Sequence, residues 1–138
     1  MADLADALRR VPLFRGLSNK DRKRLAKAMS ERTFPEGKTI VEQGHEGVGF
    51  FVIDDGNATV SVDGKVVGTL GPGDHLGEVA MIDKGPRSAT IVATTEVRCY
   101  GMTAWEFRPF IQEHPEVAWP LLETLVARLR ESGVDHQS

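Results

Sequence analysis

The stretch ATVSVDGKVVGTL, residues 58–70, sets two runs of β-prone residues on either side of an Asp-Gly pair. Because Asp and Gly tolerate the positive φ angles of a two-residue turn, Asp63-Gly64 predicts a β-hairpin. Asp54-Asp55-Gly56-Asn57 predicts a second hairpin turn for the same reason. Other short β-prone runs lie at residues 39–41, 50–53, 89–93 and 97–100. Short strands with closely spaced turns predict a sandwich or barrel rather than a parallel sheet.

Helical patterns lie on both sides of these β-prone runs. On the N-terminal side, Ser18 followed by Asp21 is typical of a helix N-cap, and Thr103 followed by Glu106 gives the same signal on the C-terminal side. His114-Pro115 divides the C-terminal pattern into two helices, because proline cannot continue the hydrogen-bond ladder of a helix.

The length of the chain and the order of these patterns predict a single domain. A chain of 138 residues can bury roughly 68% of the surface that its unfolded form exposes, which is enough for one core. Since helices precede and follow the strands, the fold class is α+β. We expect one domain over residues 1–138, with helices at 1–31, a sandwich or barrel of strands at 32–101 and helices at 103–132.

The last helix carries a wide apolar stripe. Its members recur every three or four residues: Val117, Ala118, Leu121, Leu122, Leu125, Val126 and Leu129. A stripe of this width can cover the strands or a partner subunit, and we expect packing in the core. It is also compatible with a homodimer. Trp105 and Trp119 are expected to pack between helices.

Composition restricts the setting in which the protein works. A lone Cys99 excludes an internal disulfide and a cysteine-based metal cluster. The sequence has no signal-peptide pattern, so we expect a cytoplasmic protein. Its apolar runs are too short for a membrane span.

Charge is unevenly distributed along the chain. Residues 1–32 carry nine basic and four acidic side chains, and the remainder carries eight basic and sixteen acidic ones. Because the basic segment lacks interleaved aromatic residues and the net charge is −3, we interpret it as the solvated face of a helix. Nucleic-acid binding is therefore not expected.

The run GDHLGEVAM, residues 73–81, differs in character from the strands and turns around it. Residues 76–81 can start a short helical turn after a glycine, and the first backbone N–H groups of such a turn lack internal acceptors and can bind a phosphate oxygen. Gly77 would allow close approach of a ligand to the backbone. The candidate ligand-binding residues of this run are Leu76, Gly77, Glu78, Val79 and Ala80.

The run PRSAT, residues 86–90, supplies positive charge near the same candidate site. Arg87 presents a planar fork of donors suited to phosphate, and Ser88 adds a hydroxyl. Small Ala89 leaves room for a ligand. Glu78 carries a charge of the same sign as phosphate and cannot bind it directly, but its carboxylate can accept a hydrogen bond from a sugar hydroxyl. A partly buried arginine is unfavourable without an anion, so the combination predicts a phosphate-bearing ligand. A salt bridge between Arg87 and Glu78 is the simpler alternative.

These two runs resemble the cyclic nucleotide-binding domain family. The family includes regulatory subunits of cAMP-dependent protein kinase, cyclic nucleotide-gated channels and catabolite activator-type regulators. Upstream, FPEGKTIVEQG at 34–44 and FFVI at 50–53 are similar to its strands. The resemblance covers about residues 10–131. It implies an eight-stranded antiparallel β-roll, jelly-roll-like, with N-terminal helices and a C-terminal pair of hinge and lid helices.

The resemblance also implies roles for individual residues. Arg87 would pair with the cyclic phosphate, assisted by Ser88 and by amides near Ala80 and Ala89. Glu78, with the glycine before it, would hold the ribose 2′-hydroxyl. The nucleotide implied is cAMP, which Ser88 in place of threonine favours, with cGMP left open.

Two further positions concern the pocket floor and the base. Leu76 stands where the family usually has phenylalanine, which keeps an apolar contact and changes the pocket floor. The base would meet the last helix. Ser132 falls near the position where activator-type relatives place a small hydroxyl residue against adenine.

The function expected from these patterns is that of a cyclic nucleotide sensor. Ligand binding would change the C-terminal helices and signal to a protein partner that the sequence does not identify. The alternative is a module of the same fold that binds no nucleotide and acts through protein interaction. Catalysis, metal and cofactors other than the ligand are not expected, because His45, His75, His114 and His136 lack the paired spacing of a metal centre. A nucleophile elbow and a phosphate loop are also missing from the sequence.

Overall fold

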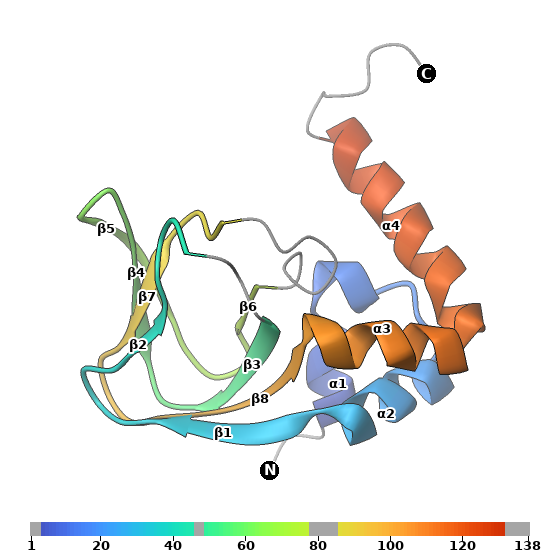
Figure 1. Ribbon diagram of the computed structural model, residues 1–138, viewed down its shortest axis with the longest axis horizontal. Coiled ribbons are helices and arrows are strands. Elements are labelled where there is room, and N and C mark those ends of the chain that lie inside the picture. The colour runs from blue at the N-terminus through green and yellow to red at the C-terminus, as the bar shows by residue number, and fades with distance from the viewer. Residues whose placement is uncertain (1–3, 46–48, 78–85, 132–138) are drawn as a thin grey trace. The chain divides into compact units, whose positions relative to one another are not determined.

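The computed structural model describes residues 4–45, 49–77 and 86–131 (Figure 1). They belong to two compact units, one drawn from residues 1–28 and 109–138 and the other from residues 29–108. The first unit is helical and the second holds the strands.

The unit of residues 29–108 contains two four-stranded antiparallel sheets. One has the strand order β1-β8-β3-β6 and the other β2-β7-β4-β5. The strands are β1 (Ser30–Phe34), β2 (Thr39–Val41), β3 (Gly49–Asp55), β4 (Ala58–Val62), β5 (Lys65–Leu70), β6 (His75–Leu76), β7 (Thr90–Ala93) and β8 (Val97–Thr103). These eight strands of the described residues confirm the expected antiparallel roll.

Inward-facing side chains of both sheets form one core. The first sheet contributes Phe51, Ile53, Leu76, Val97 and Cys99, and the second contributes Ala58, Ile91 and Ala93. Alternating burial along β7 and over residues 97–101 of β8 is the period-2 pattern of strands that have one face on a core. Burial raises the pKa of the Cys99 thiol to about 11, so this side chain is an inert packing residue.

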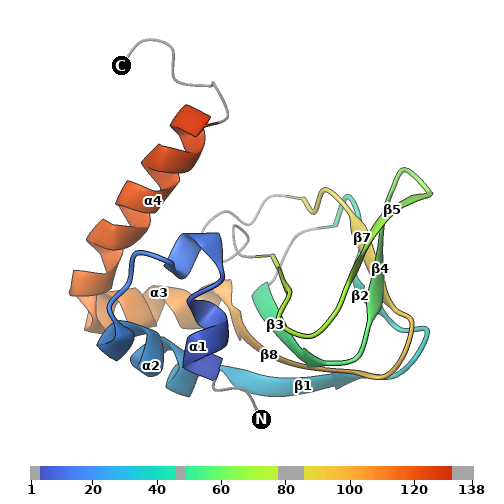
Figure 2. The same ribbon diagram turned by 180° about the vertical axis from the view of Figure 1, so that it is seen from behind.

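The β4–β5 hairpin is confirmed, with Val62 paired to Lys65 across a two-residue turn. Asp63 and Gly64 have φ angles of 52° and 82°, as the turn requires. Figure 2 shows this hairpin from behind, with its turn projecting beyond the neighbouring strands.

The second hairpin prediction is wrong, because β3 and β4 lie in different sheets. The turn at Asp54-Asp55-Gly56-Asn57 is instead a corner between the sheets. Gly56 has φ 98° there, and a Cβ at this position would lie 2.9 Å from the Val97 Cα atom. The Asn57 carbonyl oxygen accepts hydrogen bonds from the backbone N–H groups of Thr94 and Thr95, which draws the chain into the second sheet.

Two boundaries also differ from expectation. The first strand begins at Ser30, whereas helix was expected to residue 31. The helical turn was expected over residues 76–81. Leu76 lies in β6, so the turn does not begin at that residue, and residues 78–81 lie outside the described residues.

In the helical unit, α1 (Leu4–Leu8) and the 3-10 turn η1 (Pro12–Phe14) precede α2 (Asn19–Ala28). The predicted cap of α2 is confirmed, since the Asp21 N–H donates to Ser18 Oγ at 3.1 Å. Fully buried Phe14 and Leu25 belong to the core of this unit.

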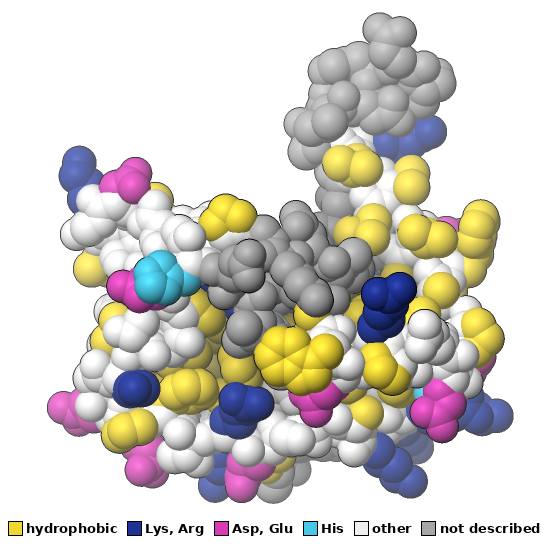
Figure 3. Space-filling view, viewed as in Figure 1, with side chains coloured by type: hydrophobic (Ala, Val, Ile, Leu, Met, Phe, Trp, Pro, Cys, Tyr) yellow, Lys and Arg dark blue, Asp and Glu magenta, His cyan; other side chains and the backbone are white. Residues whose placement is uncertain are grey.

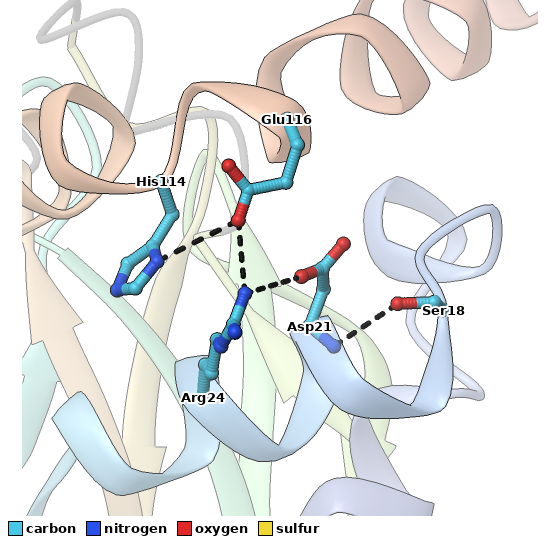
Figure 4. Close-up of polar contacts among 5 residues, drawn as sticks. All are labelled: Ser18, Asp21, Arg24, His114 and Glu116. Atoms are coloured by element: carbon cyan, nitrogen blue, oxygen red, sulfur yellow. Dashed lines mark hydrogen bonds and ion pairs between the residues drawn. The ribbon is translucent and has the colours of Figure 1, made fainter.

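A polar cluster joins α2 to η3 (Pro115–Val117), the 3-10 turn between the two C-terminal helices (Figure 4). Arg24 Nη1 lies 2.9 Å from Glu116 Oε1 and 3.4 Å from Asp21 Oδ1. His114 Nδ1 lies 3.6 Å from the same Glu116 oxygen. These contacts bring together residues that are 92 positions apart in the sequence.

The predicted division at His114-Pro115 is confirmed, with α3 (Ala104–Glu113) before it and α4 (Ala118–Glu131) after it. The cap of α3 is confirmed too. Glu106 Oε1 accepts from the Thr103 N–H at 2.8 Å and from its hydroxyl at 2.7 Å.

The apolar stripe of the last helix is only partly buried. Val117 and Leu121 are buried, whereas Leu122 at 50%, Val126 at 49% and Leu129 at 50% stay exposed, as does the neighbouring Trp119 at 68%. Hydrophobic side chains are visible along α4 in Figure 3. Trp105 is 60% exposed, so packing of both tryptophans between helices was a wrong expectation.

Candidate functional site

Two backbone hydrogen bonds hold Arg87 in place. Its N–H donates to the His45 carbonyl oxygen at 2.8 Å, and its carbonyl oxygen accepts from the Gly44 N–H at 2.9 Å. The two bonds join the segments that follow β2 and precede β7, two strands that pair antiparallel. Long-range backbone hydrogen bonds therefore fix the main chain from which the Arg87 side chain extends.

The guanidinium of Arg87 is half-buried and only partly satisfied. Nη2 donates to the Gly49 carbonyl oxygen at 2.6 Å. Nε is buried and has no hydrogen-bond partner among the described residues. Burial lowers the pKa of this guanidinium, and within residues 4–45, 49–77 and 86–131 no carboxylate forms an ion pair with it.

An incompletely paired guanidinium can bind an anion. Arginine remains protonated at neutral pH even when burial lowers its pKa. A buried charged donor without a partner is costly, and an anion that accepts from Nε would remove that cost. The arrangement therefore favours a phosphate or carboxylate ligand over a neutral one.

Gly77 lies against the same guanidinium. Its φ angle is 76°, in the left-handed region that favours glycine. A Cβ atom at this position would overlap both Arg87 Nη1 and the Gly49 carbonyl oxygen. Gly77 thus supplies the space that the Arg87 side chain occupies. The close approach of a ligand to the Gly77 backbone stays a prediction.

A tight turn sets the path of the chain into Gly77. The Asp74 N–H donates to the Gly71 carbonyl oxygen at 3.0 Å, and Asp74 Oδ2 accepts from the Gly71 N–H at 2.8 Å. The Ile53 N–H donates to the Asp74 carbonyl oxygen at 2.8 Å, which anchors the turn on β3. The short strand β6 follows and ends directly before Gly77.

The other predicted site residues are placed unevenly. Leu76 is buried in the core cluster of the roll. Ser88 is exposed and Ala89 is half-buried, both between Arg87 and β7. Glu78, Val79, Ala80 and Ser132 lie outside the described residues, so their roles stay predictions.

Three residues that contact Arg87 were missed by the sequence analysis. Gly44 and His45 pair with its backbone, and Gly49 accepts from its guanidinium. The glycine spacing in GHEGVG, residues 44–49, was a signal that could have indicated tight backbone packing. A Cβ at Gly49 would lie 2.6 Å from the Met102 carbonyl oxygen, which explains the glycine there.

Two other classes of site are absent from the described residues. Within them, His, Cys, Asp and Glu side chains do not gather in a group of three that could hold a metal ion. None of the described helices combines the length and apolar character that a membrane crossing requires.

Comparison with known proteins places this geometry in context. Residues 31–114 match the family model of the cyclic nucleotide-binding domain. A cAMP-dependent protein kinase regulatory subunit of Eremothecium gossypii is 40% identical over 94 residues, which is 67% of this chain. The chain spans only 20% of that relative's length.

Solved structures show the same similarity. The N-terminal domain of a transcriptional regulator from Streptomyces coelicolor A3(2) has a TM-score of 0.85 and 34% identity, covering 96% of each chain. The Thermus thermophilus catabolite activator protein has a TM-score of 0.69 and 30% identity, over 89% of this chain and 60% of that one.

Proposed function

The chain belongs to the cyclic nucleotide-binding domain family, and on that premise we propose that it is a sensor of cyclic nucleotides, with cAMP as its ligand. The observation that carries the proposal is the half-buried guanidinium of Arg87, whose buried Nε lacks a partner among the described residues. The cyclic phosphate of the ligand carries a negative charge and would accept hydrogen bonds from this guanidinium.

In the proposed complex the ligand phosphate pairs with Arg87. Its oxygens accept from the Nε–H and from guanidinium N–H groups that are not already bonded to Gly49. Ser88 adds its hydroxyl, and the backbone amides near Ala80 and Ala89 add donors. Because the Gly49 carbonyl and the Gly77 backbone fix the guanidinium before the ligand arrives, little side-chain entropy is lost on binding.

The rest of the ligand is assigned to residues on either side of the phosphate. Glu78 accepts from the ribose 2′-hydroxyl beside Gly77, and the base extends toward the C-terminal helices near Ser132. The adjoining Leu76, Val79 and Ala80 contribute backbone and small apolar surface. The similarity to a cAMP-dependent kinase regulatory subunit supports cAMP, while cGMP is the competing ligand in every titration.

Signalling is proposed to follow from a population shift in the C-terminal helices. Helix α3 passes from one compact unit to the other between Arg108 and Pro109. Pro109 lies inside the helix and has no N–H, so the helix lacks one backbone hydrogen bond at this point. Such a position can absorb a bend on ligand binding, and amide exchange over residues 103–131 with and without ligand tests it. Identical exchange in both states would exclude this step.

The partner that receives the signal is proposed to be a second copy of the chain. The exposed side chains of Trp119, Leu122, Val126 and Leu129 are spaced by three, four and three residues. This spacing is that of a coiled-coil seam, in which two like helices pack side by side. The family homologues are regulatory modules, and we propose a regulatory rather than a catalytic role here.

Calorimetric titration with cAMP and cGMP tests the function. Wild-type protein is expected to bind cAMP saturably, and Arg87→Ala to bind roughly 100-fold more weakly, since two or more charge-assisted hydrogen bonds are lost. Arg10→Ala removes the same charge from an exposed position and is expected to bind normally. If the folded wild type binds neither nucleotide, the non-binding interaction module becomes the better account.

A further inference from the structure

The segment that positions Arg87 is itself held by a residue outside the site. Gln43 directly precedes Gly44 and His45, whose backbone groups pair with that of Arg87. Whatever fixes Gln43 therefore limits the movement of the Arg87 backbone.

Gln43 uses its backbone N–H and both ends of its side-chain amide in hydrogen bonds. Its backbone N–H donates at 2.9 Å to Oγ1 of Thr90, the first residue of β7. Its Nε2 donates to Asp63 Oδ1 at 2.9 Å, and its Oε1 accepts from the Asp63 N–H at 2.8 Å. The two side-chain bonds are reciprocal, so the amide group is fixed in orientation as well as in position.

Asp63 is well placed to receive these bonds. It occupies the first position of the β4–β5 turn and, with φ 52°, is the only non-glycine residue of the described chain with a positive φ. Its N–H lies outside the β4–β5 ladder, in which Val62 pairs with Lys65. Gln43 therefore supplies the acceptor that this turn lacks.

We propose that Gln43 and Asp63 are positioning residues for the anion site at Arg87, a role that rests on the proposed function. The two reciprocal bonds form a Gln43–Asp63 clasp. This clasp ties the β4–β5 turn to the segment that pairs with the Arg87 backbone. Releasing the clasp lets this segment move, and the guanidinium then spends less time in the orientation that meets the phosphate. Neither residue contacts the ligand in this proposal.

The clasp can be broken and rebuilt by exchanging its donor and acceptor. Gln43→Glu removes the Nε2 donor and sets two carboxylates against each other, whereas the double variant Gln43→Glu with Asp63→Asn restores a donor at position 63. Asn also tolerates the positive φ of this turn. Gln112→Glu, at an exposed position of α3, introduces the same charge away from the site and serves as the control.

The expected result is loss and rescue of affinity. Gln43→Glu raises the Kd for cAMP about 5- to 10-fold, the effect of about one hydrogen bond plus like-charge repulsion, and the double variant returns to within about 2-fold of wild type. Gln112→Glu binds like wild type. A merely structural defect would not be rescued by a second substitution, so equal Kd values for the single and double variants would overturn the proposal.

A second measurement keeps the clasp testable if no nucleotide binds. Amide hydrogen exchange of Gly44 and Arg87 in the free protein reports directly on the backbone pair. Exchange is expected to be faster in Gln43→Glu and to return to the wild-type rate in the double variant. Unchanged exchange in Gln43→Glu would refute the clasp even in a protein that binds cAMP, whereas rescue without any binding would leave the clasp standing and refute the proposed function.

Discussion

Gly77 leaves the space in which Nη1 of Arg87 lies, because a Cβ atom on Gly77 would overlap that nitrogen. Gly77→Ala is therefore expected to displace the guanidinium and to weaken cAMP binding at least ~10-fold. Backbone strain at the positive φ is expected to lower the free energy of unfolding by ~1–2 kcal/mol as well. Titration calorimetry and urea unfolding of the same variant separate the two effects.

Gly37→Ala is the matched control for this substitution. Gly37 has φ 84°, close to that of Gly77, but a Cβ there meets nothing within 4 Å. Both variants are expected to lose similar stability, and only Gly77→Ala to lose affinity. Equal affinity losses would show that backbone strain, and not the contact with Arg87, is responsible.

The α3 cap gives the protein a predictable response to acid. Hydrogen bonds from the Thr103 N–H and hydroxyl lower the pKa of Glu106 from its usual 4.5. The ionised carboxylate therefore contributes stability above pH 4.5, and this contribution is lost as the pH falls through the lower folded-state pKa. Glu106→Gln is expected to cost about 0.5 kcal/mol of unfolding free energy at pH 7. In urea unfolding the difference from wild type should vanish at acid pH; a constant difference would contradict the cap.

The Arg24–Glu116 ion pair is expected to contribute little. Its side chains are 35% and 49% exposed, so solvent and salt screen the attraction. Glu116→Gln should lower the free energy of unfolding by about 0.2–1 kcal/mol at low salt and by less at high salt. Glu113→Gln, at an exposed position of α3, is the control. A loss that does not change with salt would point to packing and not to charge.

The row of exposed side chains on α4, which consists of Trp119, Leu122, Val126 and Leu129, predicts dimerisation. Light scattering coupled to size-exclusion chromatography should find a dimer of the wild type at high protein concentration and a monomer of Val126→Glu, because a charge in a coiled-coil seam is unfavourable. Ala127→Glu adds the same charge beside the row and should remain dimeric. A wild type that stays monomeric at all concentrations would leave the row without its proposed partner.

Local sequence signals predicted the parts of the fold that depend on near neighbours. Both helix caps involve residues three positions apart, Ser18 with Asp21 and Thr103 with Glu106, and both are confirmed. The Asp63-Gly64 turn is confirmed for the same reason, since its φ angles are set by the two residues themselves.

Features that depend on distant segments were not predictable in the same way. Whether the turn after β3 returns to the same sheet depends on β8, which pairs with β3 from more than 40 residues away and cannot be read from Asp54–Asn57. Likewise, the type of residue at Arg87 indicated an anion site, but its contact with Gly49 spans 38 residues. The burial of an apolar stripe depends on its neighbours too, which is why α4 exposes side chains that its periodicity placed in a core.

The most direct test of the central claim is the ¹H–¹⁵N resonance of the Arg87 Nε–H group during titration with cAMP. This donor is buried without a partner among the described residues. On saturation it is predicted to shift downfield as it donates to the ligand phosphate, while the Nε–H resonance of exposed Arg10 stays in place. An Arg87 resonance that does not move at saturating cAMP would contradict the account.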